Sequence, residues 1–172
     1  LFFYRIYFKD VNNLNTKVIK QDNTELNKNN LIKNLKYSVK LENNTQYSIT
    51  ALESEITYVD NNEIVLMKNV KGFFENKNQS ILKISSKKAI FNNNNYNTFF
   101  EEDVKIEYMG NIMGSDKLIL NFEKNVVVMR DNIVYEGLKG LGKADIVKID
   151  LITRDIEISM NDQNNKIEIT SQ

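Results

Sequence analysis

The side chains that could perform chemistry in this sequence are carboxylates, lysines and tyrosines, because the chain has no histidine and no cysteine. The commonest general base and metal ligand and the thiolate nucleophile are therefore missing. Carboxylates cluster at residues 101–103, and Glu53 and Glu55 share a predicted strand face, as a paired-carboxylate hydrolase would require. Acidic runs are more commonly a solvated face, and no nucleophile stands beside a base. We expect no enzymatic activity, no cofactor and no metal site.

A second candidate is a phosphate-binding loop at residues 137–144, whose sequence fits the spacing G-x-x-x-x-G-K. That motif needs a Ser or Thr after the lysine to hold Mg²⁺, and this chain has Ala144 there. The residues that follow alternate with a period of two, whereas a phosphate loop opens a helix. We interpret Gly137, Gly140 and Gly142 as a turn and a bulge between two hairpins.

Length and charge restrict the classes of protein further. With 172 residues and 41% hydrophobic content, the chain can form one domain with a substantial core. Its 23 basic residues balance 23 acidic residues, so the chain as a whole has no attraction to nucleic-acid phosphates. The absence of cysteine leaves the redox compartment open, since such a protein is stable in either.

The N-terminal fifth differs in composition from the rest. Residues 1–8 are apolar and aromatic around Arg5, but a membrane span needs about 20 such residues. We expect residues 1–9 to be the end of an N-terminal transmembrane anchor; the alternative is a strand that packs on the domain. Residues 10–33 are polar and have the composition of a linker. We expect the folded domain at residues 34–172.

The folded part alternates between apolar and polar residues with a period of two, which predicts strands, and no stretch has helical periodicity. Regular strands separated by Asn- and Asp-rich turns predict an all-β antiparallel sandwich, jellyroll or barrel. The first strand is expected at residues 31–41 and a short last strand at 166–170. Four hairpins are expected at residues 47–74, 82–108, 112–129 and 141–160, turning near residues 60–62, 92–95, 123–125 and 153–155.

The alternation also predicts which side chains face the interior. In the first hairpin we expect Tyr47 inward and Ser48, Thr50, Val65 and Met67 outward. A closed hydrophobic core explains such a face, and so does a groove that holds a lipid; periodicity does not distinguish the two. The predicted interior positions, which would bind lipid if the interior is a groove, are Ile49, Ala51, Ile64, Leu66, Val70, Ile84, Phe100, Val104, Ile106, Ile112, Leu118, Leu120, Phe122, Val126 and Val128.

Over residues 31–160 the sequence resembles the LptC family of lipopolysaccharide export proteins, within the wider group of LptA- and OstA-type β-jellyroll proteins. The order and spacing of four soft patterns carry the resemblance. They are Tyr47-x-Ile49-x-Ala51 with Glu53, Asn61-Asn62-Glu63-Ile64-x-Leu66-x-x-Val70, Phe99-x-x-x-x-Val104, and Asn132-x-Val134-x-x-Gly137-x-x-Gly140-x-Gly142-x-Ala144.

The resemblance implies an antiparallel β-jellyroll of stacked hairpins in the periplasm, held at the bacterial inner membrane by a single-pass anchor. Such a protein is a non-enzymatic carrier in outer-membrane biogenesis. It receives lipopolysaccharide from the subunits of an inner-membrane ABC transporter and passes it, acyl chains inside, to a periplasmic bridge protein of the LptA type. The alternatives are a structural adaptor with a closed core and a soluble LptA-like bridge component without an anchor.

Overall fold

The chain forms one antiparallel β-sheet in a computed structural model that describes residues 31–40, 45–76, 79–108, 110–137, 140–161 and 168–170. Every regular element among these residues is a strand and none is helical, which confirms the expected all-β class. The strands are β1 (Leu31–Lys40), β2 (Thr45–Val59), β3 (Asn62–Asn76), β4 (Gln79–Asn92), β5 (Thr98–Tyr108), β6 (Asn111–Asn121), β7 (Val126–Gly137), β8 (Gly140–Asp150), β9 (Ile156–Ser159) and β10 (Glu168–Thr170).

The sheet follows the order of the sequence, because each strand from β1 to β8 pairs with the next. At its last edge β8 is shared by two short strands, with β9 on residues 146–149 and β10 on residues 141–143. The four expected hairpins are present as β2–β3, β4–β5, β6–β7 and β8–β9. Their turns lie within two residues of the predicted positions, since Asn and Asp tolerate the backbone angles that tight turns need.

The start of the folded part differs slightly from the expected boundary. β1 begins at Leu31, three residues before the domain start expected at residue 34. Residues 1–30, which hold the expected anchor end and most of the expected linker, lie outside the described residues. The expected last strand at residues 166–170 is represented by β10.

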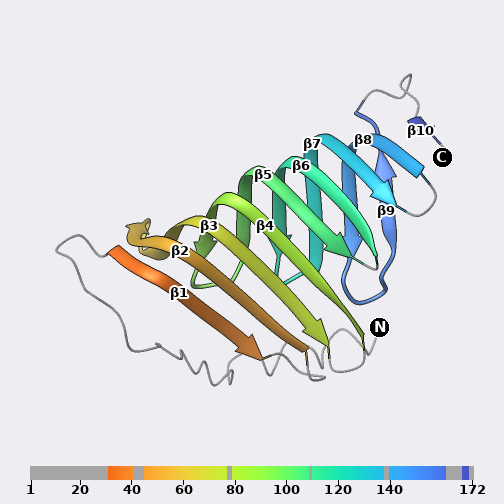
Figure 1. The fold of residues 1–172 in the computed structure, drawn as a ribbon. Helices are drawn as coiled ribbons and strands as arrows, with labels where there is room; N and C mark the ends of the chain where they lie inside the picture. The colour runs from red at the N-terminus through yellow and green to blue at the C-terminus, as the bar shows by residue number, and fades with distance from the viewer. Residues whose placement is uncertain are drawn as a thin grey trace.

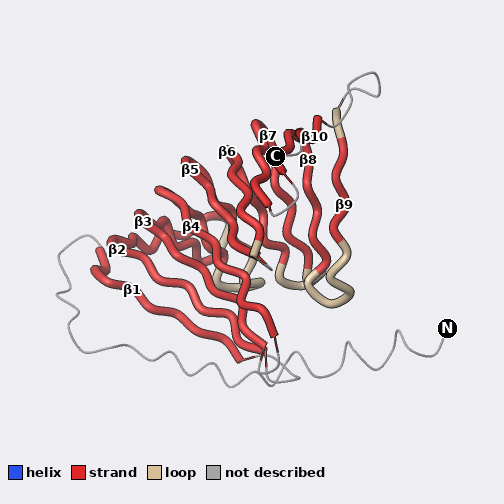
Figure 2. The backbone as a smooth tube through the Cα atoms, turned by 45° about the vertical axis from the view of Figure 1, so that its right-hand side comes forward, coloured by secondary structure: helices blue, strands red, loops and turns tan. Residues whose placement is uncertain are grey.

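The long strands bend near their middles, and the bends line up across the sheet as a crease (Figures 1 and 2). The pairing register shifts at the crease between each two neighbouring strands from β4 to β8. Alternate strands carry left-handed residues there: Asn34 on β1, Asn69 on β3, Glu102 and Asp103 on β5, and Asp131 and Asn132 on β7. Since every bend has the same sense, the sheet folds over on itself and one of its faces becomes an interior.

The crease divides the sheet into two layers, which we call leaf A and leaf B. Leaf B contains the arrowheads of β1, β3, β5 and β7 in Figure 1. Leaf A comprises residues 31–33, 53–59, 62–68, 88–92, 98–101, 117–121, 126–130, 146–150 and β9. Leaf B comprises residues 35–40, 45–51, 70–76, 79–86, 104–108, 111–115, 133–137, 140–144 and β10.

The crease overturns part of the predicted face assignment. In β3, Val65 and Met67 were expected outward, but they are 6% and 2% exposed, and Leu66, expected inward, is 41% exposed. The prediction assumed an unbroken period of two from Ile64 to Val70. Asn69 has a φ of 51°, which turns the strand over by one residue and reverses the faces on its far side.

Other predicted interior positions are also wrong, through the bend in β6 and through the pairing register beyond the β6–β7 turn. Ile112, Val126 and Val128 were expected inward, but their neighbours Met113, Val127 and Met129 are the buried residues. Ile64 is only partly buried, and Phe122 packs against the core while partly exposed. The positions expected inward and found buried are Ile49, Ala51, Val70, Ile84, Phe100, Val104, Ile106, Leu118 and Leu120, and Tyr47 with them.

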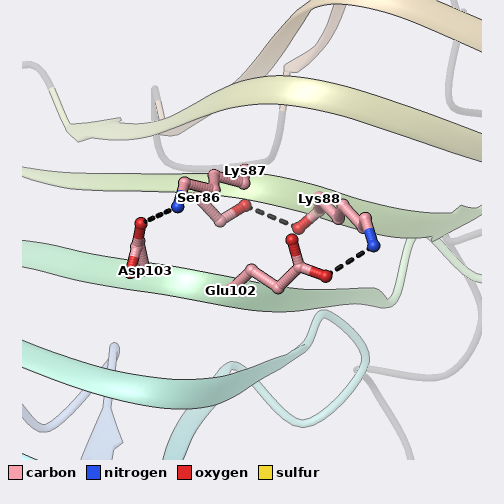
Figure 3. A network of polar contacts seen from close by, with 5 residues as sticks. All are labelled: Ser86, Lys87, Lys88, Glu102 and Asp103. Atoms are coloured by element: carbon pink, nitrogen blue, oxygen red, sulfur yellow. Dashed lines mark hydrogen bonds and ion pairs between the residues drawn. The ribbon is translucent and has the colours of Figure 1, made fainter.

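Small residues line the inner side of the crease, where the two leaves diverge from a sharp bend and leave little room. They are Ala51 and Ser54 on β2, Ser86 and Ala89 on β4, Ser115 on β6 and Ala144 on β8. Two of the serines also stabilise the bend through a hydrogen bond to the backbone two residues on. Ser86 Oγ donates to the Lys88 carbonyl (2.7 Å; Figure 3) and Ser115 Oγ to the Lys117 carbonyl (2.9 Å).

We predict that Ser86→Leu destabilises the fold by about 1–3 kcal/mol, because the larger side chain has no space inside the bend. Ser85→Leu is the matched control: it places the same side chain one residue earlier, on the outer face, and should change stability by no more than about 0.5 kcal/mol. Chemical denaturation of the two variants makes the comparison. Equal free energies of unfolding would show that the inner crease is not tightly packed.

Candidate functional site: the interior between the leaves

The interior is built from apolar side chains of both leaves that bury one another. Tyr47, Ile49 and Ile106 of leaf B and Phe100 and Leu118 of leaf A are all fully buried. Each lies on a strand position whose two chain neighbours point outward, so alternation within each leaf delivers one apolar face to the interior. In this conformation the described part of the interior is a closed hydrophobic core.

Aromatic contacts join the leaves. The Tyr47 hydroxyl of leaf B is hydrogen-bonded to Thr98 Oγ1 of leaf A at 3.1 Å, in a buried position. The rings of Tyr37 and Phe91 lie 5.0 Å apart, and those of Tyr47 and Phe122 lie 5.9 Å apart. These spacings suit favourable tilted aromatic pairs. We call these five residues the aromatic latch, since each contact runs from leaf B to leaf A or its turns.

The turn between β4 and β5 adds a further ring to the latch. Asn92 Oδ1 accepts from the backbone N–H of Asn94, and the N–H of Tyr96 donates to the Asn92 carbonyl, so the asparagines hold the turn in shape. Tyr96 has a φ of 59° and its ring lies 5.4 Å from Phe122 and 6.2 Å from Tyr37. The Asn-rich turn predicted from the sequence therefore also positions an interior aromatic residue.

The interior is electrically neutral near the latch. Burial raises the pKa of both Tyr37 and Tyr47 well above the ordinary tyrosine value of 10.0, and for Tyr47 the hydrogen bond with Thr98 opposes this only in part. At the crease, Ser54 is also buried, and its Oγ has no hydrogen-bond partner among the described residues. The described part of the interior therefore suits hydrocarbon, since the polar side chains buried in it are uncharged serines, a threonine and tyrosines.

The interior face is exposed at the C-terminal edge of the sheet. Ile156 and Ile158 of β9 lie directly opposite Ile149 and Val147 of β8, which are buried. Directly opposed residues in an antiparallel pair point to the same side. Ile156 and Ile158 nevertheless remain 44% and 41% exposed, so an apolar surface continuous with the core reaches solvent at this edge.

The carboxylates considered from the sequence lie outside this interior, on the outer side of the crease. Asp103 pairs with Lys87 and Glu102 with Lys88, from β5 to β4 (Figure 3). These hydrogen bonds raise the pKa of both lysines. Ion pairs so exposed contribute little stability, and their arrangement is that of a solvated face.

The other chemical candidates also take structural roles. Glu53 pairs with Lys68 at 3.2 Å on the neighbouring strand. Gly137 and Gly140 pair at the end of the β7–β8 hairpin, so the glycine-rich segment continues into a strand and opens no helix. Among the described residues no group of three or more acidic side chains could hold a metal ion.

No protein-family model matches the chain, and no curated protein matches it. The described residues contain no helix long and apolar enough to span a membrane.

We predict that the stability of the protein falls as the pH rises above about 10, since Tyr37 and Tyr47 are held neutral only in the folded state. The pKa values of both tyrosines are higher in the folded protein than in the unfolded protein. The stability that they contribute is therefore complete below the unfolded pKa and is lost as the pH rises from there towards the folded pKa. Tyr47→Phe should cost about 0.5–1.5 kcal/mol at neutral pH, from the lost hydrogen bond. It should also reduce the slope with which the free energy of unfolding falls at alkaline pH, by at most about 1.4 kcal/mol per pH unit.

Denaturant titrations between pH 7 and pH 12 measure both effects. Tyr58→Phe is the matched control, because it removes a tyrosine hydroxyl from a residue that is 67% exposed. If Tyr47→Phe kept the alkaline slope of the wild type, Tyr47 would not be buried as described.

Proposed function

We propose that this chain is a non-enzymatic lipopolysaccharide carrier of the LptC type, with its folded sheet as a β-jellyroll that shelters acyl chains. The observation that carries the proposal is one apolar interior running between the leaves and emerging at Ile156 and Ile158. The choice of lipopolysaccharide as the lipid rests on the resemblance to the LptC family over residues 31–160. A hairpin stack folded along one crease is compatible with the jellyroll that the resemblance implies.

The physical chemistry of the interior supports a lipid ligand. Transfer of an acyl chain from water into an apolar interior gains about 0.8 kcal/mol per CH₂. The interior is neutral at the latch, so it favours hydrocarbon over the charged headgroup, which would remain in water. Since the leaves are closed, an acyl chain enters only where they separate, and it then replaces the apolar contacts that the leaves give up.

The two edges of the sheet offer two places where a partner protein could bind and exchange lipid with this domain. β1 is the terminal strand at one edge of the sheet, whereas the other edge is divided between β9 and β10. A terminal strand offers unpaired backbone groups to a neighbouring sheet. In this proposal the transporter and the LptA-type bridge protein pair with these edges, and residues 1–9 end the inner-membrane anchor that keeps the domain in the periplasm.

A structural adaptor is the second candidate, and the closed core favours it. Tyr47, Phe100 and Ile106 are fully buried, and a protein that only joins two partners would need no more than this. Both candidates use the sheet edges. They differ in whether lipid ever lies between the leaves.

Photocrosslinking in cells that express the full chain separates the two candidates. A photoreactive residue at Ile106, which is buried, should form an adduct with lipopolysaccharide. The same residue at Ile119, which is exposed on the outer face of leaf A, is the control and should form none. Adducts absent from Ile106 and from a second interior site, Phe122, would exclude the carrier and leave the adaptor.

A further inference from the structure

A row of lysines crosses the outer face of leaf B. The strand pairing places Lys36, Thr50, Lys71, Ser85, Lys105, Gly114, Val134 and Lys143 side by side, one from each strand from β1 to β8. We call Lys36, Lys71, Lys105 and Lys143 the lysine row. With strands about 4.8 Å apart, its first three members are spaced by about 10 Å and the whole row spans about 34 Å.

The lysine row points away from the interior. Its members are exposed, and the residues beside them along each strand, such as Tyr37, Val70, Val104 and Ala144, are buried. Thr50, Ser85 and Gly114, which lie between the lysines, have short side chains. The ammonium groups therefore project furthest from this part of the sheet. The leaf B arms of β1, β3, β5 and β7 run in nearly the same direction in Figure 1, so they present the row on one face.

The positive charge of the row is not neutralised within the described part of the chain. Lys36, Lys71 and Lys143 form no ion pair with any described carboxylate, and Lys105 has only a long contact of 3.9 Å to Glu107. Glu107 is shared with Lys83 at 3.5 Å. The lysines of the crease differ, since Lys68, Lys87, Lys88 and Lys117 each pair with a carboxylate of an adjacent strand.

The carboxylates nearest the row leave it exposed on both sides. On the crease side, Asp103 is engaged by Lys87, and Asp131 by Lys117. On the other side, Glu107 and Glu136 belong to the next outward-facing positions of β5 and β7, two residues further from the crease. No acidic residue occupies the row itself from β1 to β8, and beyond its last member β10 places Glu168 directly opposite Lys143, so the unopposed part of the row runs from Lys36 to Lys105.

We propose that the outer face of leaf B docks on the surface of an anionic lipid bilayer through the lysine row. Charge complementarity and shape select this partner. The formal net charge of the chain is +0, so attraction to an anion is local to the row, and a row of this length without walls matches an extended surface better than a small anion. This inference is independent of lipid transport, because the row lies on the face opposite to the interior.

Cosedimentation of the full chain with lipid vesicles tests the proposal. We expect binding to vesicles that contain phosphatidylglycerol to exceed binding to pure phosphatidylcholine vesicles by about tenfold or more, and to weaken as salt screens the charges. The row variant K36Q/K71Q/K105Q/K143Q should bind both kinds of vesicle equally weakly. Residues 1–8, with Arg5, are the same in the wild type and the variant, so the difference between the two proteins on anionic vesicles measures the row alone.

The control variant K68Q/K88Q/K117Q/K148Q removes the same number of charges from the crease and leaf A, where all four lysines are paired. It should keep the preference for anionic vesicles, and circular dichroism should show both variants folded. If both variants lost the same amount of binding to anionic vesicles, binding would depend on overall charge, and the proposal would be overturned. Release by inorganic phosphate at constant ionic strength would assign the row to a soluble anion and overturn it as well.

Discussion

The crease is the constraint on which the rest of the structure depends. A single antiparallel sheet has one apolar and one polar face. Its apolar face would remain in water unless another layer covered it. Here the sheet covers itself, because the long strands change direction at one level. Small residues such as Ser86 and Ala144 make room inside the bend, while left-handed residues such as Asn69 and Asp131 allow the backbone to turn. The interior exists only as a consequence of this bend.

Closure of the interior depends on contacts between residues far apart in the sequence. Tyr47 and Thr98 meet across the leaves, and Tyr37 meets Phe91. Hydrogen bonds of the sheet hold each leaf together, whereas only side chains hold the leaves to each other. Separation of the leaves would therefore break side-chain contacts and leave the strand pairing intact, with the crease as the hinge.

The hairpins and their turns could be predicted from the sequence, because both are recorded in neighbouring residues. The crease could not be predicted from a constant period of two, and this explains the reversal of Val65 and Met67. A local signal was nevertheless present. At each such place a small residue is followed by two residues that interrupt the alternation between apolar and polar positions, and then by an apolar residue. This pattern occurs at residues 86–89, 115–118 and 144–147, each of which proved to be a bend. The aromatic latch gave no such local signal, since its partners lie between 51 and 75 residues apart.

The lysine row could not be recognised from the sequence either, because it depends on register across eight strands. Its members are separated in the chain by between 34 and 38 residues, and each has an ordinary alternating environment. Pairing converts that spacing into one row. The crease, by contrast, gathers lysines and carboxylates in nearly equal numbers, and their ion pairs cancel. A chain of zero net charge can therefore present a basic surface on one leaf, since neutralisation is concentrated where the sheet bends.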